Sequence, residues 1–275
     1  MKSLNLNAAV VILCAVILSG CFMERIDLEL NSTNKKVVIN AWLTNLDEEQ
    51  SVNLSYTTDY LDPISKDYID NANISITDGD NEFNLSYTQD GDYLLPSNWR
   101  GQVGKTYQIT VDIDNEVYTA SSEMRIMPEI ENVFAEISEK EEESEDEDPF
   151  YDVYFSFEDT EGEGDGYYGV IYNKGTLSGD TIFNGDFIDD EFIDGSYFED
   201  VNLTSSTHIA GDTVILDLHS IGIETSNYLT DIQEEIFRGG LFDAAPVNVR
   251  SNFSNGALGF FITSGARRIE LIIEE

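Results

Sequence analysis

The 275-residue chain is strongly acidic: 14 Lys and Arg residues stand against 54 Asp and Glu residues, which gives a formal net charge of −40 at pH 7. This charge excludes a nucleic-acid partner, because neutralising phosphates requires clustered Lys and Arg, and it disfavours electrostatic binding to an anionic leaflet. The hydrophobic content of 41% is enough for one or two domains with buried cores.

A bacterial export signal is predicted over residues 1–20. Lys2 gives it a positive start, an unbroken apolar run covers residues 8–18, and the run ends in Leu18-Ser19-Gly20-Cys21. The run is too short to span a bilayer, which needs about 20 apolar residues. Small residues directly before a cysteine are what the signal peptidase for lipoproteins requires, so we predict cleavage before Cys21. An ordinary secretory signal or an N-terminal anchor is the alternative.

Cys21 is therefore the predicted lipidation site, with lipid on its thiol and on the new amino terminus, and residues 21–36 form a lipidated tether. The other cysteine, Cys14, lies in the signal. The mature body thus has no cysteine for a disulfide, a zinc site or a nucleophile. Membrane attachment must then come from the lipid on Cys21.

Residues 37–128 are predicted to form an antiparallel β-sandwich of the immunoglobulin type. Apolar and polar residues alternate in short runs with no helical period between them. Turn sequences separate the runs, as expected for hairpins. The predicted strands are 37–43, 52–56, 74–76, 83–87, 107–113 and 117–120, and the predicted turns are 78–81, 90–91 and 114–115.

Residues 129–275 are predicted to form a second, β-rich domain with one helix. Thr225 or Ser226 can cap that helix, an apolar stripe continues to Ile236, and Arg238-Gly239-Gly240 is a typical helix stop. The predicted strands are 130–137, 151–157, 167–172, 214–218, 258–262 and 268–273.

An acidic loop is predicted at residues 139–148, where only Lys140 and Ser144 interrupt the carboxylates. Like charges repel and stay solvated, which favours a loop. A calcium-binding loop is the alternative, although the stretch lacks the spacing and the turn glycine of a known calcium motif.

Four aromatic residues are candidate ligand contacts. Phe187, Phe192 and Tyr197 lie in the stretch 183–200, where aromatic residues are interleaved with aspartates. This pattern is suited to stacking on sugars or to binding cations. Hairpin alternation with the aromatic rings inward explains the same pattern and is the favoured interpretation. Trp99, in a turn region, is the candidate for an exposed contact.

No catalytic constellation stands out in the sequence. His208 and His219 are its two histidines, too few for a histidine-based zinc site, and no G-x-S-x-G motif is present. The glycines between 162 and 166 alternate with acidic residues that would repel phosphate, which indicates a turn and not a nucleotide site. We therefore predict no enzyme activity, metal or cofactor; a hydrolase with unidentified carboxylates is a weaker alternative.

The order of these features resembles a family of Bacteroidetes lipoproteins known as domain of unknown function family 4249. After the lipidation motif, the matching pieces are spread over nearly the whole chain: residues 26–28, 36–44, 72–78, 103–107, 157–159 leading to Tyr167-Tyr168, and 247–261 with Asn255-Gly256 and Gly259-Phe260-Phe261. The acidic loop and the Asp/Phe stretch depart from the family, so function borne by those loops is not carried across.

The resemblance implies a two-part, β-rich lipoprotein of the outer membrane, in a setting similar to that of partners of TonB-dependent transporters. It implies no catalytic residues. We therefore expect a non-enzymatic accessory or binding component that helps to capture a nutrient. A stand-alone surface module for glycan binding or adhesion is the alternative, and the sequence leaves open whether the body faces the medium or the periplasm.

Overall fold

The computed structural model describes residues 35–58, 66–138, 149–162, 164–173, 176–177, 186–189, 194–202, 208–236, 238 and 249–274. The predicted signal peptide, Cys21, nearly all of the tether and the acidic loop lie outside these ranges. Lys35–Glu275 is one compact unit. None of the helices within the described ranges has the length and apolar character needed to cross a membrane.

The described part is mainly β, with several antiparallel sheets, as the sequence predicts, and contains one α-helix. The strands before residue 128 are β1 (Val37–Thr44), β2 (Ser51–Tyr56), β3 (Asp67–Tyr68), β4 (Asn73–Thr77), β5 (Glu82–Asn84), β6 (Ser86–Tyr87), β7 (Asp92–Leu94), β8 (Thr106–Ile113) and β9 (Glu116–Glu123). The later elements are β10 (Ile130–Ile137), β11 (Tyr151–Glu158), β12 (Asp165–Asn173), β13 (Thr176–Leu177), β14 (Asp186–Asp189), β15 (Tyr197–Asn202), β16 (Thr213–Gly222), α2 (Ile223–Ile236), the 3₁₀ turn η3 (Ser254–Gly256) and β17 (Phe261–Ile272).

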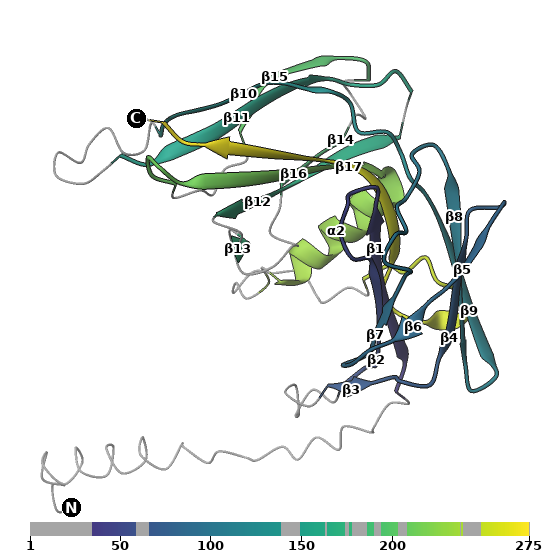
Figure 1. The fold of residues 1–275 in the computed structure, drawn as a ribbon. Helices are drawn as coiled ribbons and strands as arrows, with labels where there is room; N and C mark the ends of the chain where they lie inside the picture. Colours follow the sequence, from purple (N-terminus) through teal and green to yellow (C-terminus); the bar gives the residue numbers. More distant parts are fainter. Residues whose placement is uncertain are drawn as a thin grey trace, which may run out of the picture. The chain divides into compact units, whose positions relative to one another are not determined.

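A 10-stranded central sheet links the two halves of the sequence (Figure 1). Its strand order is β13-β12-β16-β17-β1-β2-β7-β6, with β14 paired to β12 and β3 paired to β2. β17 pairs in parallel with β1 through Phe261 and its next three residues, and antiparallel with β16 through the residues from Gly265 onward. The two separate strands predicted at 258–262 and 268–273 are therefore largely one strand, because each part of it has its own partner.

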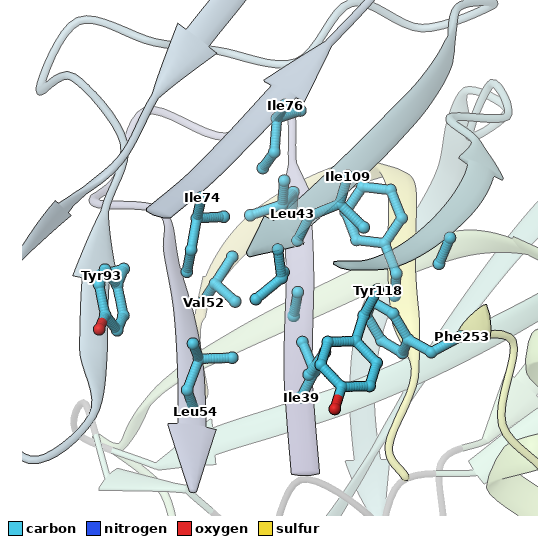
Figure 2. Packing of buried hydrophobic residues seen from close by; sticks show 14 of the residues in the cluster. Ile39, Leu43, Val52, Leu54, Ile74, Ile76, Tyr93, Ile109, Tyr118 and Phe253 are labelled. Carbon is cyan, nitrogen blue, oxygen red and sulfur yellow. The ribbon is translucent and has the colours of Figure 1, made fainter. Parts of the chain in front are cut away.

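The first half forms a β-sandwich. A four-stranded sheet with the order β5-β4-β8-β9 faces β1, β2 and β7 of the central sheet. Alternation decides which side chains meet between the sheets: Ile39 and Leu43 point inward from β1, Ile74 and Ile76 from β4, and all are almost fully buried. Figure 2 shows these side chains in one cluster, with Phe253 contributed from far along the chain.

The predicted strand 83–87 changes sheets midway. Phe83 pairs with Ile76 in the four-stranded sheet, whereas Tyr87 pairs with Tyr93 in the central sheet. Leu85 lies between the two short strands and packs against the sandwich core. Apolar and polar residues keep alternating where the chain passes from one sheet to the other. The sequence therefore indicates a single strand.

In the second half of the chain, other elements pack on both faces of the central sheet. A three-stranded sheet with the order β10-β11-β15 packs on one face, over an aromatic cluster that includes Phe157 and Tyr167. Helix α2 packs on the opposite face, where Tyr228 and Leu229 contact a separate cluster that includes Tyr168. Figure 1 shows β12, β16 and β17 between the three-stranded sheet and the helix.

Helix α2 begins earlier than its sequence predicts. It starts at Ile223, directly after β16, so Thr225 and Ser226 are not caps but buried residues inside the first turns. The backbone N–H of Ile223 donates to the carbonyl of Gly164, a partner from the turn before β12. This tertiary hydrogen bond replaces the local cap that a serine or threonine side chain would supply.

The boundary predicted at residue 128 coincides with a change of core. Met124 belongs to the sandwich cluster and Met127 to the cluster under the three-stranded sheet. The central sheet crosses this boundary, however, because β1 is hydrogen-bonded to β17. Separate folding of 37–128 and 129–275 stays a prediction, and the pairing of β1 with β17 argues for a single cooperative unit.

Candidate functional site

A pocket of about 550 Å³ opens at the end of the sandwich where β1 begins. We call it the end pocket. Its inner wall is formed by buried or half-buried side chains of the two facing sheets, and its rim carries polar and charged groups. The lining consists of Lys35, Lys36, Val37, Tyr56, Ile113, Asp114, Glu116, Tyr118, Asn255, Gly256 and Ala257.

The hairpin between β8 and β9 brings two carboxylates to the rim. Asp114 and Asn115 both have positive φ, 53° and 70°, which is the conformation that tight two-residue hairpin turns require. The turn holds Asp114 at the tip and Glu116 at the first position of β9. Asn71 donates a hydrogen bond to Asp114 over 3.1 Å, which fixes the carboxylate relative to the opposite loop.

The opposite side of the end pocket comes from a segment near the C-terminus. η3 is fastened to the edge of β9 because the Ser254 hydroxyl accepts a hydrogen bond from the Thr119 N–H over 2.8 Å. The Asn255 side-chain amide donates to the carbonyl of Val117 over 2.5 Å. These contacts place Asn255 beside the β8–β9 turn, although the two segments are separated by 138 positions in the sequence.

Both tyrosines of the end pocket stay neutral at physiological pH. The Tyr118 hydroxyl donates to a Glu116 carboxylate oxygen over 2.7 Å, and burial together with this contact raises the pKa of Tyr118 to about 12. Burial also raises the pKa of Tyr56, and the carboxylates of Asp114, Asp67 and Glu116 raise it further, while Lys35 acts in the opposite direction. The potential at the Tyr56 hydroxyl is therefore negative.

The end pocket can hold a polar ligand but offers no evident nucleophile. Its rim presents carboxylate acceptors, lysine donors and neutral hydroxyls around an apolar wall, the composition that small-molecule sites commonly show. Within the described ranges, no group of three or more His, Cys, Asp and Glu side chains could hold a metal ion. The predicted calcium alternative concerned residues 139–148, which lie outside those ranges.

A smaller pocket of about 360 Å³ lies where β8 and β9 meet the junction of β16 and α2. Its lining mixes charges of both signs, with Glu123 and Glu224 around Arg125. The Arg125 guanidinium lies 4.0 Å from the Glu123 carboxylate. Charged groups of this pocket, like those of the end pocket, therefore already have partners within the protein.

His219 contacts the buried Ser264, and the sequence alone does not predict this contact. Its Nδ1 lies 3.1 Å from the Ser264 hydroxyl, which also accepts a hydrogen bond from the Trp42 indole over 2.8 Å. Burial lowers the pKa of His219 to about 4. Ser264 is 0% exposed, so a substrate cannot reach its hydroxyl in this structure, and the arrangement stabilises the packing of Trp42 on the central sheet.

The prediction that Trp99 is an exposed contact residue is wrong. Trp99 is only 5% exposed and lies in the sandwich core, edge-on to Phe83 and Tyr107. Its turn folds back over the end of the sandwich, because the Trp99 N–H bonds to the carbonyl of Pro96 and the N–H of Gly101 bonds to that of Thr44. The indole therefore points between the sheets.

The other predicted contacts are only partly described. Phe187 lies in β14, where its backbone pairs with Tyr168, and its side chain is outside the described part, as is the whole of Phe192. Tyr197 lies in β15 and is 48% exposed. Tyr197 does not line the end pocket, and neither does any other residue of the aromatic and aspartate stretch 183–200 within the described ranges.

Tyr197 lies on the solvent-facing side of the three-stranded sheet. Its hydroxyl is 3.3 Å from a Glu131 carboxylate oxygen and 3.4 Å from the Asn132 amide nitrogen. On the same sheet Phe134 and Tyr154, both half-buried, stack with 5.3 Å between ring centroids. We call these three aromatic rings and their acidic neighbour the sheet face.

Comparison with known proteins gives a family and a weak structural likeness. The family described as "Domain of unknown function (DUF4249)" matches residues 23–270. The search of curated proteins found no match to the chain. Among solved structures, a segment of two fibronectin type III domains from chicken tenascin is similar over 69% of this chain and 92% of that chain, with 15% identity and a TM-score of 0.20.

Proposed function

The chain belongs to the family described as domain of unknown function DUF4249, and from this premise we propose that it is an outer-membrane lipoprotein like the Bacteroidetes proteins that it resembles. Its body acts without catalysis as an accessory or binding component of a TonB-dependent transporter and helps to capture a nutrient. The observation that carries the proposal is the short apolar run that ends in Leu18-Ser19-Gly20-Cys21.

Two further observations support a binding role over an enzymatic one. The end pocket has a size and lining suited to a small polar ligand. The contact between His219 and Ser264 is buried, because Ser264 is 0% exposed. A net charge of −40 also leaves the lipid as the main source of membrane affinity.

Replacement of Cys21 by alanine should move the protein from the membrane fraction to the soluble fraction. The lipid is the proposed anchor, and without it the acidic body has no attraction to an anionic membrane surface. Fractionation followed by immunoblotting measures the distribution, with Ser19→Ala as a variant that keeps a small residue before Cys21. A Cys21→Ala protein that stays in the membrane would contradict lipid anchoring.

Association with a transporter is tested by affinity purification. Tagged full-length protein is purified from gently solubilised outer membranes, and its partners are identified by mass spectrometry. Recovery of a TonB-dependent transporter at near-equal stoichiometry supports the accessory role. Recovery of the protein alone contradicts it.

The second candidate function is a stand-alone surface module for glycan binding or adhesion. The observation that favours it is the sheet face, where the stacked Phe134 and Tyr154 are half-buried and Tyr197 is exposed beside Glu131. Aromatic rings that reach the surface are suited to stacking on sugars or on a partner's surface. Binding of the chain to immobilised polysaccharide that is lost in a Tyr154→Ala variant would favour this function; unaffected binding, or none, would exclude the sheet face.

A further inference from the structure

The end pocket has the dimensions of a site for one or two sugar rings. Its volume of about 550 Å³ lies within the range of about 300–1,000 Å³ that is common for small-molecule sites. Val37, Ile113 and Ala257 are each at most 8% exposed and give it an apolar wall. Such a wall can receive the C–H face of a sugar, while the polar rim faces its hydroxyl groups.

The rim supplies both kinds of hydrogen-bonding partner. Asp114 and Glu116 accept, Lys36 donates, and a tyrosine hydroxyl can do either. Within the described part of the chain, no hydrogen bond satisfies the Tyr56 hydroxyl, and this residue is half-buried at the pocket. A ligand hydroxyl would give Tyr56 the partner that the protein does not provide.

Charge decides between ligand classes. An anion is disfavoured because three carboxylates, Asp114, Asp67 and Glu116, dominate the field at Tyr56. A cation would meet the ammonium groups of Lys36 and of Lys35, which is paired with Asp67 over 2.5 Å, so the attraction of the carboxylates is partly offset. A neutral molecule with many hydroxyl groups avoids both penalties and can satisfy carboxylates and ammonium groups together.

We propose that the end pocket binds a neutral, polyhydroxylated ligand of the size of a mono- or disaccharide, with Tyr56, Asp114 and Glu116 as its hydrogen-bonding contacts. The inference rests on the proposed binding role and names the class of nutrient. It places the ligand beside the start of β1.

The test is calorimetric titration of the full-length, detergent-purified protein with glucose, galactose, mannose and cellobiose, and in parallel with inorganic phosphate and choline. We expect at least one sugar to bind, and we expect Tyr56→Phe and the double variant Asp114→Asn/Glu116→Gln each to weaken that binding about tenfold or more. Asparagine tolerates the positive φ at position 114, so the turn is kept.

Asp90→Asn is the matched control. Asp90 also has a positive φ, 50°, in an exposed turn, but it does not line the end pocket. Its substitution should leave sugar binding unchanged. Phosphate or choline binding without sugar binding would overturn the proposal, as would sugar affinity that is unchanged in both pocket variants. Because transporter recovery is a separate measurement, failure here would leave the accessory role standing.

Discussion

Replacing Gly265 with alanine should lower the free energy of unfolding by about 3 kcal/mol or more. Gly265 lies in β17, where the strand leaves β1 and joins β16. The segment after β9 pairs with β17 at this point: Arg125 forms a parallel bridge with Ser264, and the N–H of Gly265 donates to the carbonyl of Arg125 over 3.0 Å. A Cβ atom at position 265 would lie 2.1 Å from that carbonyl oxygen and 3.1 Å from the N–H nitrogen of Met127.

Backbone atoms cannot rotate away, so relief of this clash requires moving the segment after β9. That movement would disturb both cores, because Met124 and Met127 belong to different clusters. Urea unfolding measures the effect. Gly222→Ala is the matched control: this strand glycine also lies near Arg125, but its Cβ would be 3.5 Å from the guanidinium, an ordinary contact. Equal stability of the Gly265→Ala variant and the native chain would contradict this close pairing of the segment after β9 with β17.

Acidification from pH 6.5 to pH 4 should cost ~3 kcal/mol of stability through His219. Burial lowers the pKa of His219 from 6.5 to about 4, so the folded chain holds the neutral ring whereas the unfolded chain takes up a proton below pH 6.5. The stabilisation is complete above pH 6.5 and is lost as the pH falls toward 4. Asp217 opposes the shift and Arg268 adds to it.

His208 should act in the same direction. It is 0% exposed, neither ring nitrogen has a hydrogen-bond partner in the described part of the chain, and burial lowers its pKa, against the opposing charges of Asp212 and Asp152. Asp78 contributes in a lower pH range, because the hydrogen bond from Lys105 holds the pKa of its carboxyl well below the usual value. Its contribution is therefore lost only under more acidic conditions.

Comparison of the native chain with His219→Gln isolates the histidine. Glutamine can still bond to Ser264 but does not titrate, so the variant should lose less stability between pH 6.5 and pH 4. Urea unfolding at several pH values gives both curves. The comparison also removes the opposite effect of protonating surface carboxylates, which relieves repulsion in a chain of net charge −40. Parallel curves would contradict the assignment to His219.

Local pattern predicts the strands of this protein well and their long-range pairing poorly. The alternation at Val52, Leu54 and Tyr56, or at Tyr107 to Ile113, is enough to identify β2 and β8, because one face of each strand is buried. Nothing local indicates that β1 pairs with β17 in parallel, because Ala41 and Phe261 are separated by most of the chain. The β1–β17 pair also explains why Phe253 belongs to the sandwich core.

The end pocket could not be predicted for the same reason. Its rim joins the start of β1, the turn at Asp114 and the 3₁₀ turn at Asn255, and each segment alone is an ordinary strand end or turn. The one available signal was the Asp114-Asn115 turn between strands that carry Ile113 and Tyr118. Trp99 shows the opposite error, since its flanking turn residues suggested exposure while the turn directs the indole inward.

Lipid attachment at Cys21 is the central claim, and the mass of the mature amino-terminal peptide tests it most directly. The protein is purified from outer membranes, digested, and its first peptide is identified by mass spectrometry. We predict a peptide that begins at Cys21 and carries lipid on both the thiol and the amino group. A peptide that begins elsewhere, or an unmodified Cys21, would contradict the account.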